Sequence, residues 1–243
     1  MDTASEVRPE VTVIVVTGGD PPDREAPVLV PEDARVVAAD SGADTALSLG
    51  LVVDEIVGDL DSVSPAALQA LRDSGASVEV HEPDKDATDL ELALIAARRH
   101  RPSHIVVLGG LGGRIDHELA NLLLVSGELV AGVDVVVRSG ACSVHVVRPH
   151  RRTTICATPG DLVSLMPMHG AARGVTTTGL RWPLTGAVLS LGTTLGLSNE
   201  LLGPMASVSC TEGVLLAVQP GAVAAPIPPR STSRPTSEVS DDR

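Results

Sequence analysis

Between residues 11 and 140, short apolar runs alternate with longer stretches that have a helical period. The runs are apolar throughout and rich in β-branched residues, which is typical of strands covered on both faces. They occupy residues 11–16, 35–39, 55–58, 77–81, 104–108 and 134–137. Strands of this kind that alternate with helices predict an open, mostly parallel α/β sheet with helices on both faces.

Helices are expected between several of these strands, over 64–74, 88–100 and 116–130. The first starts at Ser64, which precedes a proline, and the second has Thr88 and Glu91 in the spacing of a capping box. In the third helix, we expect four leucines to share one apolar side: Leu119, Leu122, Leu123 and Leu129.

The pattern changes near residue 140. From 141 to 220, short apolar runs follow one another about every ten residues, with glycine and proline between them. This spacing predicts a second, all-β domain, a sandwich or a barrel, after an α/β domain over 11–140. Residues 221–243 are rich in proline and serine and predict a disordered tail.

Charge and composition exclude several classes of function. The chain has 18 basic and 31 acidic residues, a net charge of −13, which is unsuited to neutralising nucleic-acid phosphates. With one Trp and no Phe or Tyr, it cannot build a stacking platform for single strands. No apolar run approaches the roughly 20 residues of a membrane span, and the first residues do not resemble a signal peptide. Three widely spaced cysteines indicate core thiols rather than disulfides. We therefore expect a cytoplasmic protein without nucleic-acid or membrane partners.

Acidic residues are concentrated between 40 and 91, where they follow apolar runs or precede a helix. Ligands of open α/β sheets bind outside the carboxyl ends of the strands. Carboxylates that converge there raise one another's pKa, and a hard cation such as Mg²⁺ relieves the repulsion. A metal–phosphate site is therefore favoured over a solvated acidic face. The candidates are Asp40, Asp59, Asp61, Asp84, Asp86 and Asp89.

A glycine-rich turn, 109–113, connects the run 104–108 to the third helix. It is either an anion-binding turn at a helix N-terminus or only a tight connection, since it matches neither GxxxxGK[ST] nor GxGxxG. Arg114, which follows the turn, favours phosphate binding. Lys85, the sole lysine, either neutralises its acidic neighbours or reaches a phosphate oxygen. A capping or packing role is favoured for His117 over a role as general base.

The motifs occur in a fixed order: 40–44, 58–62, 84–89 with Glu91, 109–117 with Asn121, and then 174–184 and 196–200. Together they resemble the thiamine pyrophosphokinase (thiamine diphosphokinase) family over roughly 11–220. The resemblance implies a homodimer with an N-terminal α/β domain that binds ATP and Mg²⁺, and a C-terminal β-sandwich. It implies that thiamine binds in a cleft at the dimer interface, and that the diphosphate of ATP moves onto the thiamine hydroxyl, releasing AMP.

The resemblance also assigns residues. It implies that Asp59, Asp61 and Asp89 are the metal-binding and catalytic carboxylates. It places Asp40 and Asp86 in support of these carboxylates, and Thr88, Arg114 and Asp116 at the nucleotide phosphates. Lys85, Gly112 and Gly113 are candidates for the same nucleotide site from the residue pattern itself. For thiamine it implies Trp182, Ser198 and Asn199. Either Asp61 or Asp89 could accept the hydroxyl proton.

Two departures and two rival interpretations remain. Ser41 stands where the family more often has glycine, and Leu60 where it has phenylalanine; we expect Leu60 to point into a core. One rival is diphosphate transfer to another hydroxymethyl heterocycle, such as a pterin, against which Trp182 argues. The other is a catalytically silent, ligand-sensing member, against which the retained aspartates argue. Trp182 itself is expected to be a substrate platform, with a core anchor as the alternative.

Overall fold

The computed structural model describes residues 10–23, 30–82, 84 and 86–221. Lys85 lies outside these residues, as does the tail expected at 221–243, except for its first residue. The N-terminal elements are β1 (Thr12–Val16), β2 (Arg35–Ala39), α1 (Gly42–Ser48), β3 (Glu55–Gly58), α2 (Pro65–Asp73), β4 (Ser77–Val80), α3 (Asp89–Arg99), β5 (His104–Leu108), α4 (Ile115–Ser126), a 3-10 turn η1 (Glu128–Val130) and β6 (Asp134–Ser139). The C-terminal strands are β7 (Cys142–Val147), β8 (Arg152–Cys156), β9 (Leu162–Thr178), β10 (Ala187–Leu189), β11 (Asn199–Glu200), β12 (Met205–Ser209) and β13 (Glu212–Gln219).

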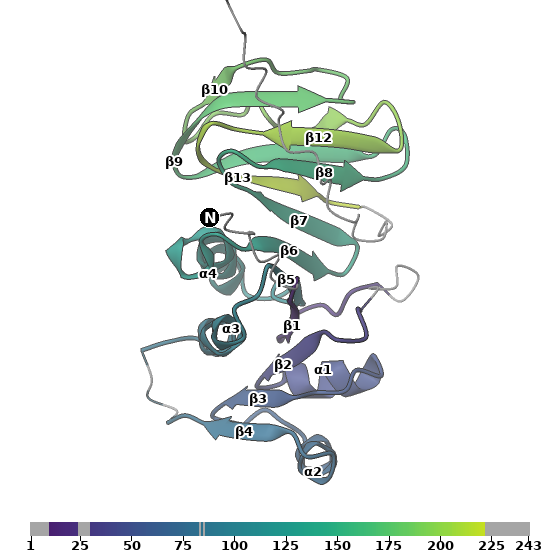
Figure 1. The fold of residues 1–243 in the computed structure, drawn as a ribbon, viewed down its shortest axis with the longest axis vertical. Coiled ribbons are helices and arrows are strands. Elements are labelled where there is room, and N and C mark those ends of the chain that lie inside the picture. Colours follow the sequence, from purple (N-terminus) through teal and green to yellow (C-terminus); the bar gives the residue numbers. More distant parts are fainter. Residues whose placement is uncertain (1–9, 24–29, 83, 85, 222–243) are drawn as a thin grey trace, which may run out of the picture.

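The strands form one mixed sheet that extends across the whole described chain (Figure 1). Strands β4, β3, β2, β1, β5 and β6 lie in this order, and each neighbouring pair is parallel. The pairing becomes antiparallel between β6 and β7, and the sheet continues through β13, β9 and β12 to β8. Hydrogen bonding is therefore continuous past residue 140, where the sequence pattern changes.

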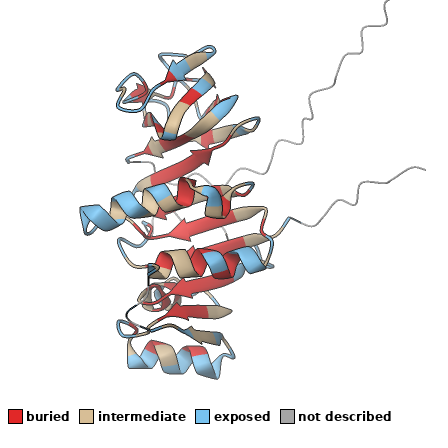
Figure 2. Cartoon of the chain, turned by 90° about the vertical axis from the view of Figure 1, so that its left-hand side faces the viewer, coloured by how far each residue is buried: buried red, intermediate tan, exposed pale blue. Residues whose placement is uncertain are grey.

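Helices cover the parallel strands on two sides, with α3 and α4 on one side and α1 and α2 on the other (Figure 1). The alternating residues of β1 divide between two cores: Val13 and Val15 pack with Leu94 of α3, whereas Ile14 and Val16 pack with Ala43 of α1. These four side chains are fully buried, which explains why β1 is apolar at every position after Thr12. Figure 2 shows the buried strands behind the exposed outer faces of α3 and α4.

The C-terminal strands enclose a third core, and β7 and β13 contribute to two cores at once. Leu215 and Ala217 of β13 pack into the C-terminal core, whereas Leu216 between them packs into the core under α3 and α4. Side chains of a strand alternate between its faces, so β13 joins the two parts of the molecule through a shared strand.

Both predicted helix starts are confirmed. The Ser64 hydroxyl accepts a hydrogen bond from Ala67 N (3.1 Å), and the Thr88 hydroxyl accepts one from Glu91 N (3.2 Å). Each bond satisfies an N–H group that has no partner within the helix. In the described part of the chain, no helix is long and apolar enough to span a bilayer.

The expected leucine stripe of α4 is wrong in part. Leu122 and Leu129 pack against the core, but Leu119 and Leu123 are 57% and 48% exposed. The helix is rotated so that Leu122 and Leu124 pack against the core, which turns Leu119 and Leu123 toward the outer face. Ile115, which is 67% exposed, extends the outer pair into an apolar stripe along α4.

Candidate active site

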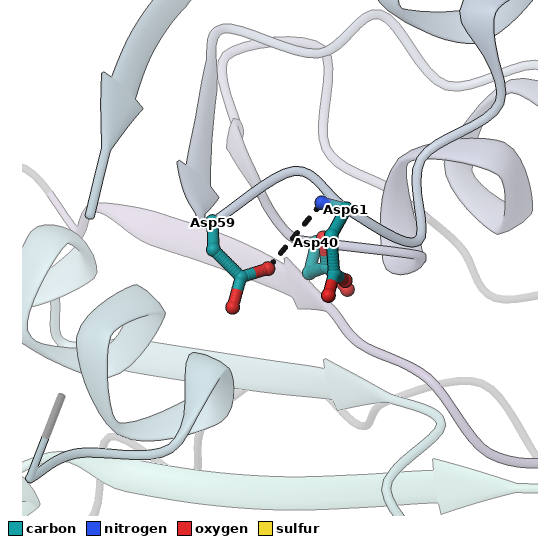
Figure 3. A group of neighbouring side chains, drawn as sticks. All are labelled: Asp40, Asp59 and Asp61. Atoms are coloured by element: carbon teal, nitrogen blue, oxygen red, sulfur yellow. Dashed lines mark hydrogen bonds between the residues drawn. The ribbon is translucent and has the colours of Figure 1, made fainter. Parts of the chain in front are cut away.

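Three carboxylates meet where β2 and β3 end. Asp40 follows β2, Asp59 and Asp61 follow β3, and one oxygen of each lies within 4.8 Å of the others (Figure 3). Because β2 and β3 are parallel neighbours, their carboxyl ends lie at the same edge of the sheet. Asp61 N donates a hydrogen bond to Asp59 Oδ1 (3.3 Å), which fixes the short loop between them. Asp40 is buried, Asp59 is partly buried and Asp61 is exposed.

Asp89, the first residue of α3, approaches the same group. A Cβ on Gly58 would lie 3.1 Å from Asp89 Oδ1 and 3.1 Å from Asp40 Cβ, so glycine leaves space for the carboxylates. Gly58 also has φ = +147°, which disfavours residues with a side chain. The pKa of Asp61 is raised chiefly by the charge of Asp59, then by burial, by Asp40, by its hydrogen bond with Asp59 and by Asp89. The four carboxylates therefore repel one another.

Two features of this group are characteristic of a ligand site. Asp40 and Leu60 have φ of +45° and +62°, a conformation that costs about 1–3 kcal/mol in residues other than glycine. Asp40 Oδ2 accepts a hydrogen bond from the Ser62 hydroxyl, whereas Asp40 Oδ1 is buried without a hydrogen-bond partner among the described residues. A buried carboxylate oxygen that accepts no hydrogen bond, and that lies beside further carboxylates, has the chemistry of a Mg²⁺ ligand. Leu60 packs against the core of α1 and α2, as predicted.

The glycine-rich turn lies at the end of β5 and leads into α4. Gly112 N and Gly113 N both donate to Glu118 Oε1, at 2.8 and 2.7 Å. Asn121 Nδ2 donates to Gly110 O (2.8 Å) and holds the start of the turn against the helix. The N–H groups of Gly112 and Gly113 thus converge on a single carboxylate oxygen.

Arg114, the N-cap residue of α4, forms a two-bond ion pair with Asp116. Arg114 Nε and Nη2 donate to the two Asp116 oxygens at 3.1 and 2.6 Å. The side chains are 73% and 61% exposed. The arginine lowers the pKa of Asp116 to about 2, so this carboxylate is ionised throughout the neutral range.

A cleft of about 330 Å³ lies between the carboxylates and the glycine-rich turn. Of the residues predicted for the site, Asp40, Thr88, Asp89, Gly113 and Arg114 line it. Other predicted residues contact the lining without being part of it. Asp59 and Asp61 lie beside Asp40, Gly112 is bonded to Glu118, and Asp116 is paired with Arg114. Asp86 is exposed beyond the end of β4.

Part of the lining was missed from the sequence. Thr17, Gly18 and Gly19 line the cleft directly after β1. Two glycines at the end of an apolar run are the signal that could have identified them, because the same rule selected Asp40 and Asp59. Ser41 also lines the cleft, where its hydroxyl lies 3.0 Å from the position of a Cβ on Gly18.

Trp182 lies in the C-terminal part and is 54% exposed, so it is not a core anchor. The Arg181 guanidinium lies 5.0 Å from the centre of its ring. Asn199 is buried; its Nδ2 donates to Trp182 O (2.7 Å) and its Oδ1 accepts from Trp182 N (3.0 Å). Asn199 therefore holds the main chain of Trp182, while Ser198 beside it is exposed. Trp182, Ser198 and Asn199 do not line the 330 Å³ cleft.

Acidic residues and a glycine-rich helix N-terminus at the carboxyl edge of a parallel sheet define a class of α/β proteins that bind phosphorylated ligands. Two family models identify the class more closely: "Thiamin pyrophosphokinase, catalytic domain" matches residues 27–137, and "Thiamin pyrophosphokinase, vitamin B1 binding domain" matches 144–215. The chain belongs to the thiamin pyrophosphokinase family.

Individual relatives agree with this assignment. The thiamine pyrophosphokinase of Bacillus subtilis is 28% identical over 211 residues, covering 86% of this chain and 98% of the relative. Thiamine pyrophosphokinase 1 of Oryza sativa subsp. japonica is 32% identical over 155 residues, 60% of this chain and 58% of the relative. The crystal structure of the Bacillus subtilis protein superposes with a TM-score of 0.72 at 26% identity, covering 86% of this chain and 98% of that one. The structure from Geobacillus thermodenitrificans gives 0.69 at 28% identity, with 86% and 96% covered.

Proposed function

We propose that this protein is a thiamine diphosphokinase, which transfers the diphosphate of ATP to the hydroxyl of thiamine and releases AMP. The observation that carries the proposal is the group of Asp40, Asp59 and Asp61, whose oxygens lie within 4.8 Å of one another at the edge of a cleft. The glycine-rich turn bounds the same cleft. Membership of the family supports the choice of thiamine as acceptor.

We assign different ligands to the two parts of the chain, according to where these groups lie. Residues 11–140 hold the carboxylates and the glycine-rich turn and would bind ATP and Mg²⁺. Residues 141–220 hold Trp182 and would form a β-sandwich that binds thiamine and the partner subunit. The parallel order of β4 to β6 supports an α/β catalytic part.

Asp59, Asp61 and Asp89 are the proposed ligands of Mg²⁺, and Asp40 completes the group. Their crowded charges fit a hard cation, as does Asp40 Oδ1, which has no hydrogen-bond partner among the described residues. When bound, Mg²⁺ supplies the positive charge that phosphoryl-type transfer requires on the phosphate oxygens.

The remaining groups of the N-terminal part position the nucleotide. The N–H groups of Gly112 and Gly113 and the planar guanidinium of Arg114 are suited to phosphate oxygens, and Asp116 orients that guanidinium. Thr88 lines the cleft beside Asp89. Either Asp61 or Asp89 could accept the proton of the attacking hydroxyl.

Trp182 is the proposed platform for thiamine, because an indole face suits both a flat pyrimidine and a cationic thiazolium. Asn199 fixes the main chain of Trp182, and Ser198 adds an exposed hydroxyl. Since Trp182 does not line the cleft of its own chain, we propose a homodimer in which thiamine binds between subunits. The exposed stripe of Ile115, Leu119 and Leu123 supports such an interface, and light scattering of the purified chain measures it.

Measurement of AMP release tests the proposed function. The purified chain is incubated with ATP and Mg²⁺ and with thiamine, a hydroxymethylpterin or no acceptor, and AMP is quantified by chromatography. The proposal predicts AMP with thiamine alone. AMP with the pterin alone would favour the pterin-type enzyme. If no reaction released AMP, a catalytically silent, ligand-sensing member would be favoured.

A further inference from the structure

Glu118 occupies the anion-binding groups of the glycine-rich turn. It is the fourth residue of α4, and its Oε1 accepts hydrogen bonds from Gly112 N (2.8 Å) and Gly113 N (2.7 Å). In a capping box, an acidic residue near the helix start reaches back to the N-cap N–H. Here the carboxylate reaches past the N-cap residue Arg114, to the two residues that precede it. Two backbone N–H groups that converge on one anionic oxygen have the arrangement of a phosphate-binding turn.

The charges around the cleft determine how the Glu118 contact affects an approaching phosphate. Glu118 lines the cleft together with Asp40 and Asp89. Arg114 is the one permanent cation among the described residues of the lining, and it is bound by Asp116. A phosphate that enters beside the turn therefore meets N–H groups that are already bonded, and a carboxylate that repels it.

We propose that Glu118 is a positioning residue that holds the N–H groups of Gly112 and Gly113 together and yields them to a phosphate of the nucleotide. Phosphate takes the place of the carboxylate on the two N–H groups, so the strength of the Glu118 contact sets the affinity for nucleotide. The inference rests on the proposed function, because it takes ATP as the ligand. The contrary view is that Glu118 is a permanent brace of the turn, in which case phosphate does not compete with it.

The charge of Glu118 distinguishes the two views. Glu118→Gln keeps the length of the side chain and an acceptor oxygen but removes the charge. If phosphate replaces the Glu118 carboxylate, this variant should bind ATP about tenfold more tightly than wild type in the presence of Mg²⁺, which is the scale of one charge-assisted hydrogen bond. Titration calorimetry measures this affinity. Adenosine, which has no phosphate, should bind equally to variant and wild type. Glu32→Gln removes one charge from an exposed turn before β2, at the opposite end of the strand from the cleft, and should change neither affinity.

Amide hydrogen exchange follows the same two N–H groups directly. If phosphate replaces Glu118 on these groups, the amides of Gly112 and Gly113 should be protected from hydrogen exchange in wild type with or without ATP. In Glu118→Ala they should exchange rapidly alone and become protected when ATP is added. Unchanged or weaker ATP binding by Glu118→Gln, or no protection by ATP in Glu118→Ala, would overturn the inference while leaving the proposed function intact. A wild-type chain that binds no ATP would overturn both.

Discussion

Replacing Asp59 with Asn should stabilise the protein and abolish most of its activity. One Asp59 oxygen lies within 4.8 Å of an Asp40 oxygen. At such a distance two unit charges repel by about 3–4 kcal/mol at an effective dielectric constant of about 20, and by about 1 kcal/mol in bulk water. Asp59 is only partly buried, so the lower figure applies more closely. Asparagine can also retain the oxygen that accepts the hydrogen bond from Asp61 N.

The expected gain in the absence of metal is therefore on the order of 1 kcal/mol, which raises Tm by about 2–4 °C for a chain of this size. The gain should shrink in high salt, because ions screen the repulsion. Mg²⁺ should raise the Tm of wild type more than that of the variant, since the variant has lost a ligand. Turnover should fall by about 100-fold or more, as when one key group is removed from a site of developing charge.

Thermal unfolding with and without Mg²⁺ at two salt concentrations, together with AMP release, measures all four effects. Asp33→Asn is the matched control, because Asp33 is exposed in the turn before β2. It should change neither Tm nor turnover. An Asp59→Asn protein with lowered Tm and near-normal turnover would refute the argument, because Asp59 would then be a structural hydrogen-bond acceptor.

Three further substitutions probe the rest of the site. Arg114→Lys should weaken ATP binding about tenfold with little change in Tm, because lysine keeps the charge of this exposed group but loses its planar fork; equal affinity in calorimetry would reduce Arg114 to a general positive charge. Trp182→Ala should raise the KM for thiamine about tenfold and leave that for ATP unchanged, and thiamine, but not a pterin, should saturably change the fluorescence of this sole Trp. Unfolding of the variant at ordinary temperature, without selective loss of thiamine affinity, would contradict that role. Gly58→Ala should reduce turnover at least about tenfold, since its Cβ would press on the carboxylates. Gly50 has φ of +72° and open space around it, so Gly50→Ala should lower stability alone. Similar turnover in the two variants would show that the contact of residue 58 with the carboxylates is unimportant.

The parts of the fold that depend on local pattern could be predicted from the sequence. The apolar runs became strands, and Ser64 and Thr88 cap helices, because side-chain burial and capping act within a few residues. Asp40 and Asp59 could be placed together because parallel strands bring their carboxyl ends to one edge. In each case a short segment and one rule of topology were sufficient.

Other features depend on contacts between distant segments and left no comparable signal. The outward direction of Leu119 and Leu123 depends on how α4 is rotated on the sheet, and not on its leucine content. Likewise, the two hydrogen bonds between the Asn199 amide and the main chain of Trp182 join residues 17 positions apart, and the sequence pattern gave no sign of them. The continuity of the sheet past residue 140 also follows from strand pairing that composition does not reveal.

The destination of the two transferred phosphates tests the central claim most directly. ATP labelled at its β-phosphorus is incubated with thiamine, Mg²⁺ and the purified chain, and the products are separated by chromatography. A diphosphotransferase that acts on thiamine must place the label in thiamine diphosphate and release unlabelled AMP in equal amount. Labelled ADP with thiamine monophosphate, or label that never reaches thiamine, would contradict the account.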